Sequence, residues 1–179
     1  MANQPGGKTR RARPMMRLLN QIRVEWLVAA FCAWHAAGLL GGDALVHAWQ
    51  HSPYDRLGWL ALILWALPAA RAIWRGGSAN GAFPVAMASL VMALIGVLGD
   101  LNFLVYWGFA ASIGSLARVA RRGWLWLVLA VCWMPVFGWF GSQLHLGAMP
   151  VNLLRLLVAA AAAAIGRCGL APAPPKTPV

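Results

Sequence analysis

Four side chains that could act as metal ligands follow one another at intervals of four residues in the segment "DALVHAWQHSPYD". They are Asp43, His47, His51 and Asp55, in a chain that has only four acidic residues and four histidines. On a helix, positions i, i+4 and i+8 advance by about 40° per step, so the first three would lie along one gently turning face. Pro53 ends any such helix before Asp55, because the residue ahead of a proline avoids the helical region.

Imidazole and carboxylate groups at this spacing suit Zn²⁺ or Cu²⁺, and we expect Asp43, His47 and His51 as ligands, with His145 as a possible fourth. A histidine pair at i and i+4 without an H-E-x-x-H context is a weak signal, however. The alternative is a solvated, hydrogen-bonded loop helix. Haem is not expected, because a site between facing helices would need two histidines within spans, and only His35 falls within one.

The composition indicates the class of protein that carries these residues. The chain of 179 residues is 61% hydrophobic and only 11% charged, with a mean hydropathy of +0.65. A soluble domain of this size could not bury so much apolar surface, so the excess must face lipid. Because lipid requires each backbone N–H and C=O group to be satisfied within its own segment, we expect an all-α, polytopic membrane bundle.

We predict six transmembrane helices, at residues 24–46, 57–74, 83–98, 103–117, 124–140 and 151–165. With both chain ends in the cytoplasm, all fifteen Lys and Arg residues except Arg56 and Arg155 fall on the cytoplasmic side. This asymmetry follows the positive-inside rule and supports an N-in, C-in topology. The predicted location is a bacterial-type inner membrane, with the first span acting as an uncleaved signal anchor.

The spans divide the chain into a basic cytoplasmic tail (1–23), a transmembrane domain (24–168) and a Pro-rich, disordered cytoplasmic tail (169–179). The net charge of +11 could suggest a nucleic-acid partner. The basic residues instead gather in the first tail and at the ends of apolar runs. Charges in that position are attracted to an anionic leaflet, so we expect anionic lipid and no nucleic acid as the partner of the basic tail.

The remaining polar residues are predicted to form a cap on the extracytoplasmic side. Asp100 and Asn102 make one turn there, and Asn152 and Arg155 begin the last span. Arg155 is expected to extend back toward the membrane surface. Polar groups near membrane depth are costly, so this cap, together with the histidines above, is the default site hypothesis. A transporter would use Asp100, Asn102 and Arg155.

Tryptophan and cysteine are expected to have structural roles. Several of the eleven tryptophans fall near predicted span ends, where indole rings favour the headgroup zone; they include Trp26, Trp74, Trp107, Trp124 and Trp139. The three cysteines form no C-x-x-C pair, so neither a disulfide framework nor a thiolate metal cluster is expected. Cys132 is predicted at mid-span, far from the polar cap, where apolar surroundings keep a thiol inert. The run "AAAAAIG" predicts close helix packing in the last span.

One stretch, "HAWQHSPYDRLGWLALILWALPAARAIWR", resembles the start of an exosortase, and "ARRGWLWLVLAVCWMPVFGW" is similar in rhythm to the spans that follow. The resemblance covers residues 44–165 and implies a multi-pass inner-membrane protein related to cysteine enzymes that process C-terminal sorting signals. Asp55 and Arg56 stand where that family has serine and histidine, and the Cys-Ser-Gly motif is absent. Arg155 alone, in "NLLR", resembles the family's Asn-x-x-Arg element, and no later histidine completes a triad. The resemblance therefore implies a degenerate or accessory relative without carried-over catalysis.

The sequence therefore predicts a small inner-membrane protein, non-enzymatic, that serves as an accessory or assembly subunit and meets a protein partner or metal through its polar cap. A transporter or channel-like component is the second interpretation. An exosortase-like protein involved in sorting exported proteins is the third.

Overall fold

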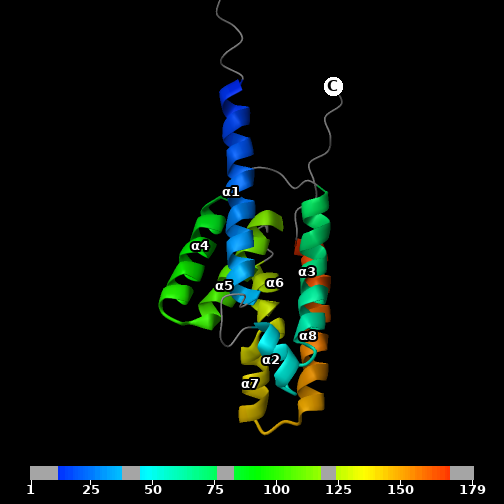
Figure 1. The fold of residues 1–179 in the computed structure, drawn as a ribbon. Helices are drawn as coiled ribbons and strands as arrows, with labels where there is room; N and C mark the ends of the chain where they lie inside the picture. The colour runs from blue at the N-terminus through cyan, green and yellow to red at the C-terminus, as the bar shows by residue number, and fades with distance from the viewer. Residues whose placement is uncertain (1–11, 38–44, 76–82, 118–123, 170–179) are drawn as a thin grey trace, which may run out of the picture.

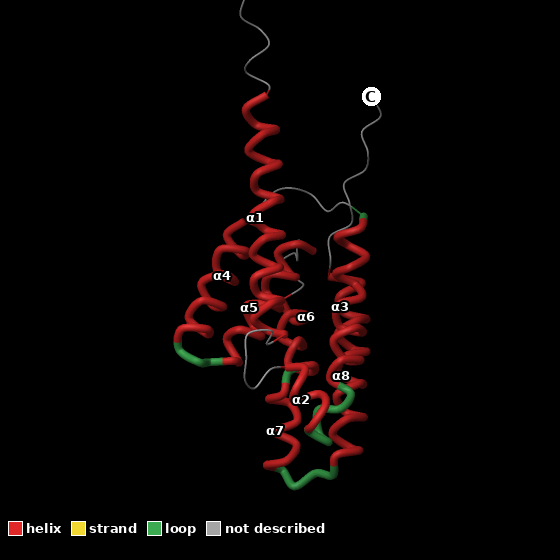
Figure 2. Tube along the Cα trace, in the orientation of Figure 1, coloured by secondary structure: helices red, strands yellow, loops and turns green. Residues whose placement is uncertain are grey.

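The computed structural model describes residues 12–37, 45–75, 83–117 and 124–169. In these ranges the chain is helical, which confirms the predicted all-α class for the described residues (Figures 1 and 2). The elements in chain order are α1 (Ala12–Ala37), α2 (Leu45–His51), α3 (Gly58–Trp74), α4 (Phe83–Leu98), α5 (Asn102–Ala117), α6 (Trp124–Val128), the 3₁₀ segment η2 (Leu129–Trp133), α7 (Pro135–Gln143) and α8 (Ala148–Gly169).

The long helices lie along a common direction and reverse from one to the next (Figure 1). α1 begins and α8 ends at the same end of the bundle, while the α4–α5 and α7–α8 turns lie toward the other. α4 and α5 form a hairpin that packs on α1, on the opposite side of the bundle from α3 and α8. The segment of α6, η2 and α7 packs against α8, and η2 also contacts α3.

By length and composition, one described helix could cross a membrane on its own. It covers Ala148–Cys168. Trp124–Trp133 and Pro135–Gln143 would add a second crossing if this pair, bent by 69°, forms one span. Shorter apolar helices of 10–17 residues cover Val24–Ala37, Gly58–Trp74, Phe83–Leu98 and Asn102–Ala117. By this measure the described residues contain one or two candidate spans.

The first predicted span has different boundaries in the structure. The helix begins at Ala12, inside the predicted basic tail, and ends at Ala37 rather than near Val46. Residues 38–44 lie outside the described part of the chain, and α2 is a separate helix of seven residues. α2 ends at His51, as Pro53 predicts.

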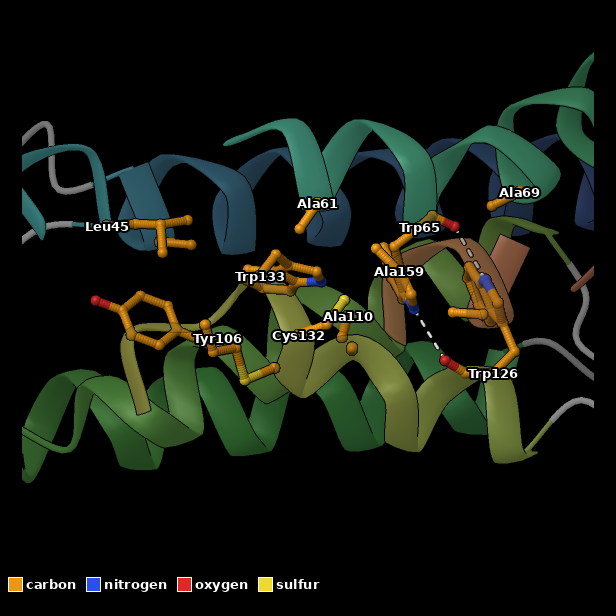
Figure 3. Packing of buried hydrophobic residues seen from close by; sticks show 14 of the residues in the cluster. Leu45, Ala61, Trp65, Ala69, Tyr106, Ala110, Trp126, Cys132, Trp133 and Ala159 are labelled. Carbon is orange, nitrogen blue, oxygen red and sulfur yellow. Dashed lines mark hydrogen bonds between the residues drawn. The ribbon is translucent and has the colours of Figure 1, made fainter. Parts of the chain in front are cut away.

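The core is built around three tryptophans that are not among those named for the interface belt. Trp65 on α3 and Trp126 on α6 are fully buried and stacked, with ring centroids 4.3 Å apart (Figure 3). Trp133 is also fully buried and packs against Trp65 at a tilt. The belt expectation agrees with the exposed indoles of Trp26, Trp74, Trp124 and Trp139, whereas Trp107 is half-buried.

The break between η2 and α7 leaves a backbone acceptor for an indole on α2. Met134 precedes Pro135 and is extended, at φ −77° and ψ 149°, because proline excludes the helical region for the residue before it. The amide of Phe137 consequently bonds to Met134 O, and Trp133 O is left for the indole of Trp49, whose Nε1 donates to it at 3.2 Å. Side chains commonly satisfy backbone groups that a broken helix leaves free.

Small residues let α8 pack closely on its neighbours, as predicted. Ala159 and Ala162 are fully buried. A Cβ atom at Gly166 would lie 2.8 Å from Trp126 Cδ1 and 2.9 Å from Pro68 Cβ. The absence of a side chain at this position therefore allows α3 and α6 to approach the α8 backbone.

Candidate functional site: a buried arginine and its carboxylate

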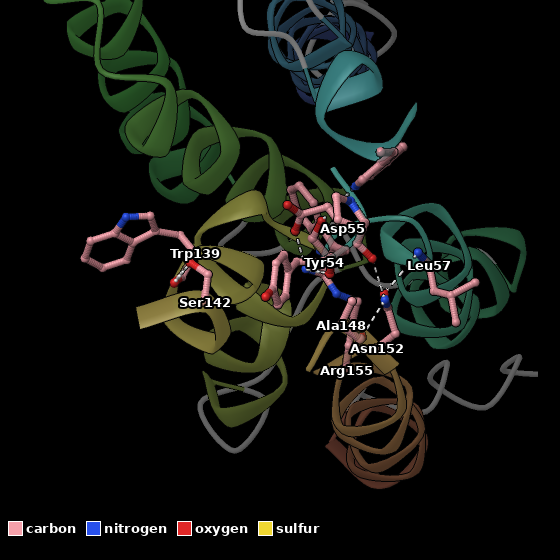
Figure 4. Close-up of polar contacts among 11 residues, drawn as sticks. Tyr54, Asp55, Leu57, Trp139, Ser142, Ala148, Asn152 and Arg155 are labelled. Carbon is pink, nitrogen blue, oxygen red and sulfur yellow. Dashed lines mark hydrogen bonds and ion pairs between the residues drawn. The ribbon is translucent and has the colours of Figure 1, made fainter. Parts of the chain in front are cut away.

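Arg155 is the most deeply buried charged residue among those described. Its side chain projects from α8 into the bundle, is 0% exposed, and forms an ion pair with Asp55 in the turn between α2 and α3 (Figure 4). The same Nη2 atom donates to Tyr54 O at 3.3 Å. The prediction that Arg155 extends back to the membrane surface is therefore wrong. A carboxylate within reach makes burial of the pair less costly than burial of the guanidinium alone.

Asn152 lies one turn before Arg155 on α8 and fixes the same α2–α3 turn. Its Nδ2 donates to Pro53 O at 2.9 Å and to Ala148 O at 2.9 Å, and its Oδ1 accepts from the Leu57 amide at 3.3 Å. Both ends of the carboxamide thus bind backbone groups that flank Asp55. The turn is held to α8 by one ion pair and by this double hydrogen bond.

Two glycines make room for the ion pair. A Cβ atom at Gly58, the first residue of α3, would lie 2.9 Å from Arg155 Nη1 and would overlap the Trp49 indole. A Cβ atom at Gly138 on α7 would lie 2.7 Å from Asp55 Cγ and would overlap the carboxylate oxygens. The backbones of α3 and α7 therefore approach the charged groups closely.

The guanidinium retains hydrogen-bonding capacity in this arrangement. Nε and Nη1 of Arg155 are buried and have no hydrogen-bond partner. The guanidinium carbon lies 5.3 Å from the centroid of the Phe137 ring, within the range of a cation–π contact. The cation is thus stabilised by one carboxylate, one carbonyl and one aromatic face, with three N–H groups left over, one on Nε and two on Nη1.

Cys132 is buried in the bundle, on an element next to the helix of Arg155. It is on η2, which packs against α8, and its side chain is fully buried. The position of Cys132 far from the polar cap stays a prediction. Cys32 is likewise buried and Cys168 exposed, and all three thiols are free.

The structure brings together only part of the predicted polar cap. Asn152 and Arg155 meet at the α2–α3 turn. Asp100 and Asn102 are exposed at the α4–α5 turn, and this hairpin lies on the opposite side of the bundle from α8 (Figure 1). Asp100 has a positive φ of 53°, a conformation that its short side chain tolerates.

The histidines remain at the surface. His47 and His51 are exposed on α2 with their rings stacked, the centroids 4.0 Å apart, and His51 Nδ1 lies 3.1 Å from His47 O. His145 is exposed at the end of α7, and its Nδ1 lies 3.1 Å from Gln143 O. Asp43 lies outside the described residues. Among those that are described, no three His, Cys, Asp or Glu side chains are grouped to hold a metal, so zinc or copper binding stays a prediction.

Comparisons of the chain with models of protein families, with curated proteins and with solved structures found no match. Interpretation of the site therefore depends on its own geometry.

Proposed function

We propose that this chain is a six-span integral membrane protein, with both ends in the cytoplasm, that acts as a non-enzymatic accessory subunit. The observation that carries the membrane part is the exposure of large apolar side chains along the helices. Leu98, Leu157 and Leu27 are 86%, 68% and 69% exposed. Further exposed examples are Ile63, Val91, Ile95, Phe103, Phe140 and Leu153. A water-soluble surface rarely carries so many large, exposed apolar side chains.

The distribution of charge supports the proposed orientation. Arg71 and Arg75, near the end of α3, and Arg167, near the end of α8, lie at the end of the bundle where α1 begins. Arg56, in the α2–α3 turn, and Arg155, in the first half of α8, lie toward the opposite end (Figure 1). Cationic residues are retained on the cytoplasmic side of bacterial membranes. The end with the greater number of arginines is accordingly proposed as cytoplasmic.

The short helices are compatible with crossings in a locally thinned bilayer. α4 and α5 have 16 residues each, which at 1.5 Å per residue gives about 24 Å. Membranes adapt to such a mismatch by thinning, at a modest cost per ångström.

Thiol labelling tests the topology. In intact spheroplasts, a membrane-impermeant maleimide should label a His51→Cys variant in a Cys168→Ser background, because His51 is exposed at the proposed outer end. It should label the native Cys168, exposed at the proposed cytoplasmic end, only after permeabilisation. Equal labelling of both positions before permeabilisation would contradict the six-span topology.

The subunit role is supported by the way the polar network holds α2. Asp55, Arg155 and Asn152 fix the α2–α3 turn to α8, so α2 presents His47 and His51 on a surface of defined geometry. A rigid polar surface loses little conformational entropy when it binds a partner. We propose that α2 carries the contact with another membrane protein, which a metal held by the two histidines could reinforce.

Purification in mild detergent tests this role. A stoichiometric partner should co-purify with the wild-type chain and be lost from a His47→Ala/His51→Ala variant, while Asn102→Ala, on the α4–α5 side, retains it. Metal analysis of the same samples should show zinc or copper only where the histidines remain. A monodisperse wild-type monomer without a partner would contradict the subunit role. If the partner co-purified with a wild-type chain that contains no metal, the contact would not depend on a metal.

The packing of η2, which carries Cys132, against α8, which carries Arg155, favours a second candidate, an exosortase-like enzyme. The Cys132 thiolate would attack a peptide carbonyl and form a thioester as the C–N bond breaks and the amine leaves with a proton, while Arg155 would stabilise the negative charge on the carbonyl oxygen. This candidate requires processing of an exported protein that carries a C-terminal sorting signal. Processing should be lost in Cys132→Ala and kept in Cys168→Ala; unchanged processing in Cys132→Ala would exclude the enzyme.

A further inference from the structure

A cavity of about 410 Å³ opens between α2 and the start of α3, at the end of the bundle proposed to be extracytoplasmic. Its walls are formed by Val46, Trp49, Gln50, Arg56 and Trp59. It lies on the surface next to the α2–α3 turn, whereas the Asp55–Arg155 pair lies inside the bundle.

The polar part of the cavity is cationic. Arg56 is exposed, and within the described ranges its guanidinium has no carboxylate in ion-pair contact. Gln50, also exposed, adds a carboxamide on the same cavity. A guanidinium presents planar N–H pairs that match the oxygen atoms of a phosphate, and an amide supplies a further donor. The cavity therefore carries the donors that a phosphate group needs.

The apolar part of the cavity is shaped by two indoles. Trp49 is half-buried and held in place by its hydrogen bond to Trp133 O at 3.2 Å, so this wall is preformed. Trp59 is 48% exposed and Val46 is 41% exposed. Indole rings at this level of a membrane protein favour the zone between headgroup and hydrocarbon. A ligand with a phosphate at one end and an apolar body at the other would fit both parts.

We propose that this cavity binds the phosphate of an anionic lipid headgroup, with the glycerol and upper acyl chain against Trp59 and Val46. The proposal rests on the membrane location proposed above. Headgroups that also carry an ammonium group bring a positive charge close to Arg56, which repels it. An anionic headgroup such as that of phosphatidylglycerol has no such charge, so it is the preferred occupant.

Photolabelling in nanodiscs tests the proposal on the full chain. Phosphatidylglycerol with a diazirine near the glycerol should form adducts on Trp49 or Trp59, about fivefold more than phosphatidylcholine with the same chains. Arg56→Gln should reduce these adducts about fivefold, the effect of one charge near an anionic lipid. Arg75→Gln, at the other end of α3, is the matched control and should leave them unchanged. Equal labelling by both lipids, or no effect of Arg56→Gln, would overturn the lipid site.

Two further measurements identify the source of the phosphate and separate this proposal from the membrane location. Excess inorganic phosphate should not reduce the adducts, because the apolar wall binds only a lipid; protection by free phosphate would replace the lipid with a soluble phosphate ligand. The same two lipids with the diazirine halfway along the acyl chain should label Leu157, exposed within α8, equally if the bundle is in the bilayer. Absence of label at Leu157 would contradict the membrane location, whereas label there without preference at the cavity would contradict only the lipid site.

Discussion

Asp55 and Arg155 are 100 residues apart in the chain, yet they form an ion pair whose side chains are 7% and 0% exposed. The pair joins the turn before α3 to the middle of α8, and α7 closes over it at Gly138. A charge in this position is stable only while its partner is present, so the pair makes the packing of three helices depend on one another.

Removal of one partner should be strongly destabilising. Asp55→Asn leaves the Arg155 cation buried without a counter-charge, which typically costs about 3–5 kcal/mol. Replacement of both residues, as Asp55→Asn/Arg155→Met, removes the buried charge and should recover most of that loss. Thermal or SDS unfolding in detergent measures both.

The exposed carboxylate of Asp100 offers a matched control for this pair. Asp100→Asn should leave the unfolding midpoint unchanged, because Asn also tolerates the positive φ of this turn. If Asp55→Asn were no more destabilising than Asp100→Asn, the pair would have no structural importance. If the double variant were no more stable than Asp55→Asn, the buried charge would not be the cause.

Asn152→Leu should weaken the attachment of the α2–α3 turn to α8. Pro53 O and the Leu57 amide would both lose their partner, and each buried group left unsatisfied costs about 1–3 kcal/mol. We expect faster amide hydrogen exchange at Leu57 together with a lower unfolding midpoint. Asn102→Ala is the exposed control, and unchanged exchange at Leu57 in Asn152→Leu would show that the carboxamide does not hold the turn.

Local sequence signals predicted part of this arrangement. Pro53 predicted where α2 ends, and the alanine run predicted the close packing of α8, because both effects act within a few residues. The partner of Arg155 could not be chosen in this way. Asp43, Asp55 and Asp100 were all expected on the same side of the membrane, and no periodicity relates them to a residue in another helix.

A charge inside a span does require a partner, and that requirement was a usable signal. Arg155 is far more costly to bury alone than paired, so one of the three acidic residues had to be considered as its counter-charge. Because Asp55 follows Pro53, the sequence seemed only to exclude Asp55 from the helical face that carries His47 and His51. This position actually places the carboxylate in a turn, from which it reaches the bundle interior.

The burial of individual tryptophans is a second feature that the sequence does not predict. An indole suits a membrane interface and a core equally well, provided that its N–H group finds an acceptor. The acceptors for Trp49 and Trp65 are backbone carbonyls at Trp133 and Trp126, in and next to the 3₁₀ segment. Composition and position along a span therefore do not separate the buried rings from the exposed ones.

Gly138→Ala should disturb the ion pair without any change of charge. The added methyl group would lie 2.7 Å from Asp55 Cγ, and overpacking of this kind costs about 1–3 kcal/mol. The control is Gly147→Ala, whose methyl group would meet Pro150 Cδ at an ordinary 3.5 Å. Comparable unfolding midpoints for the two variants would show that α7 does not close tightly over Asp55.

Trp65→Phe should loosen the contact between α3 and α6. Trp65 Nε1 donates to Trp126 O at 2.8 Å, and Trp126 Nε1 donates in return to Trp65 O at 3.0 Å, with the two rings within 5° of parallel. Phenylalanine keeps the apolar contact but leaves the Trp126 carbonyl without its indole donor, at a cost of about 1–3 kcal/mol. The stacked indoles should also give an exciton couplet in circular dichroism that disappears in this variant. Trp74→Phe, on the same helix but 93% exposed, should keep both the couplet and the stability; loss of the couplet in Trp74→Phe instead would place the stacked pair elsewhere in the chain.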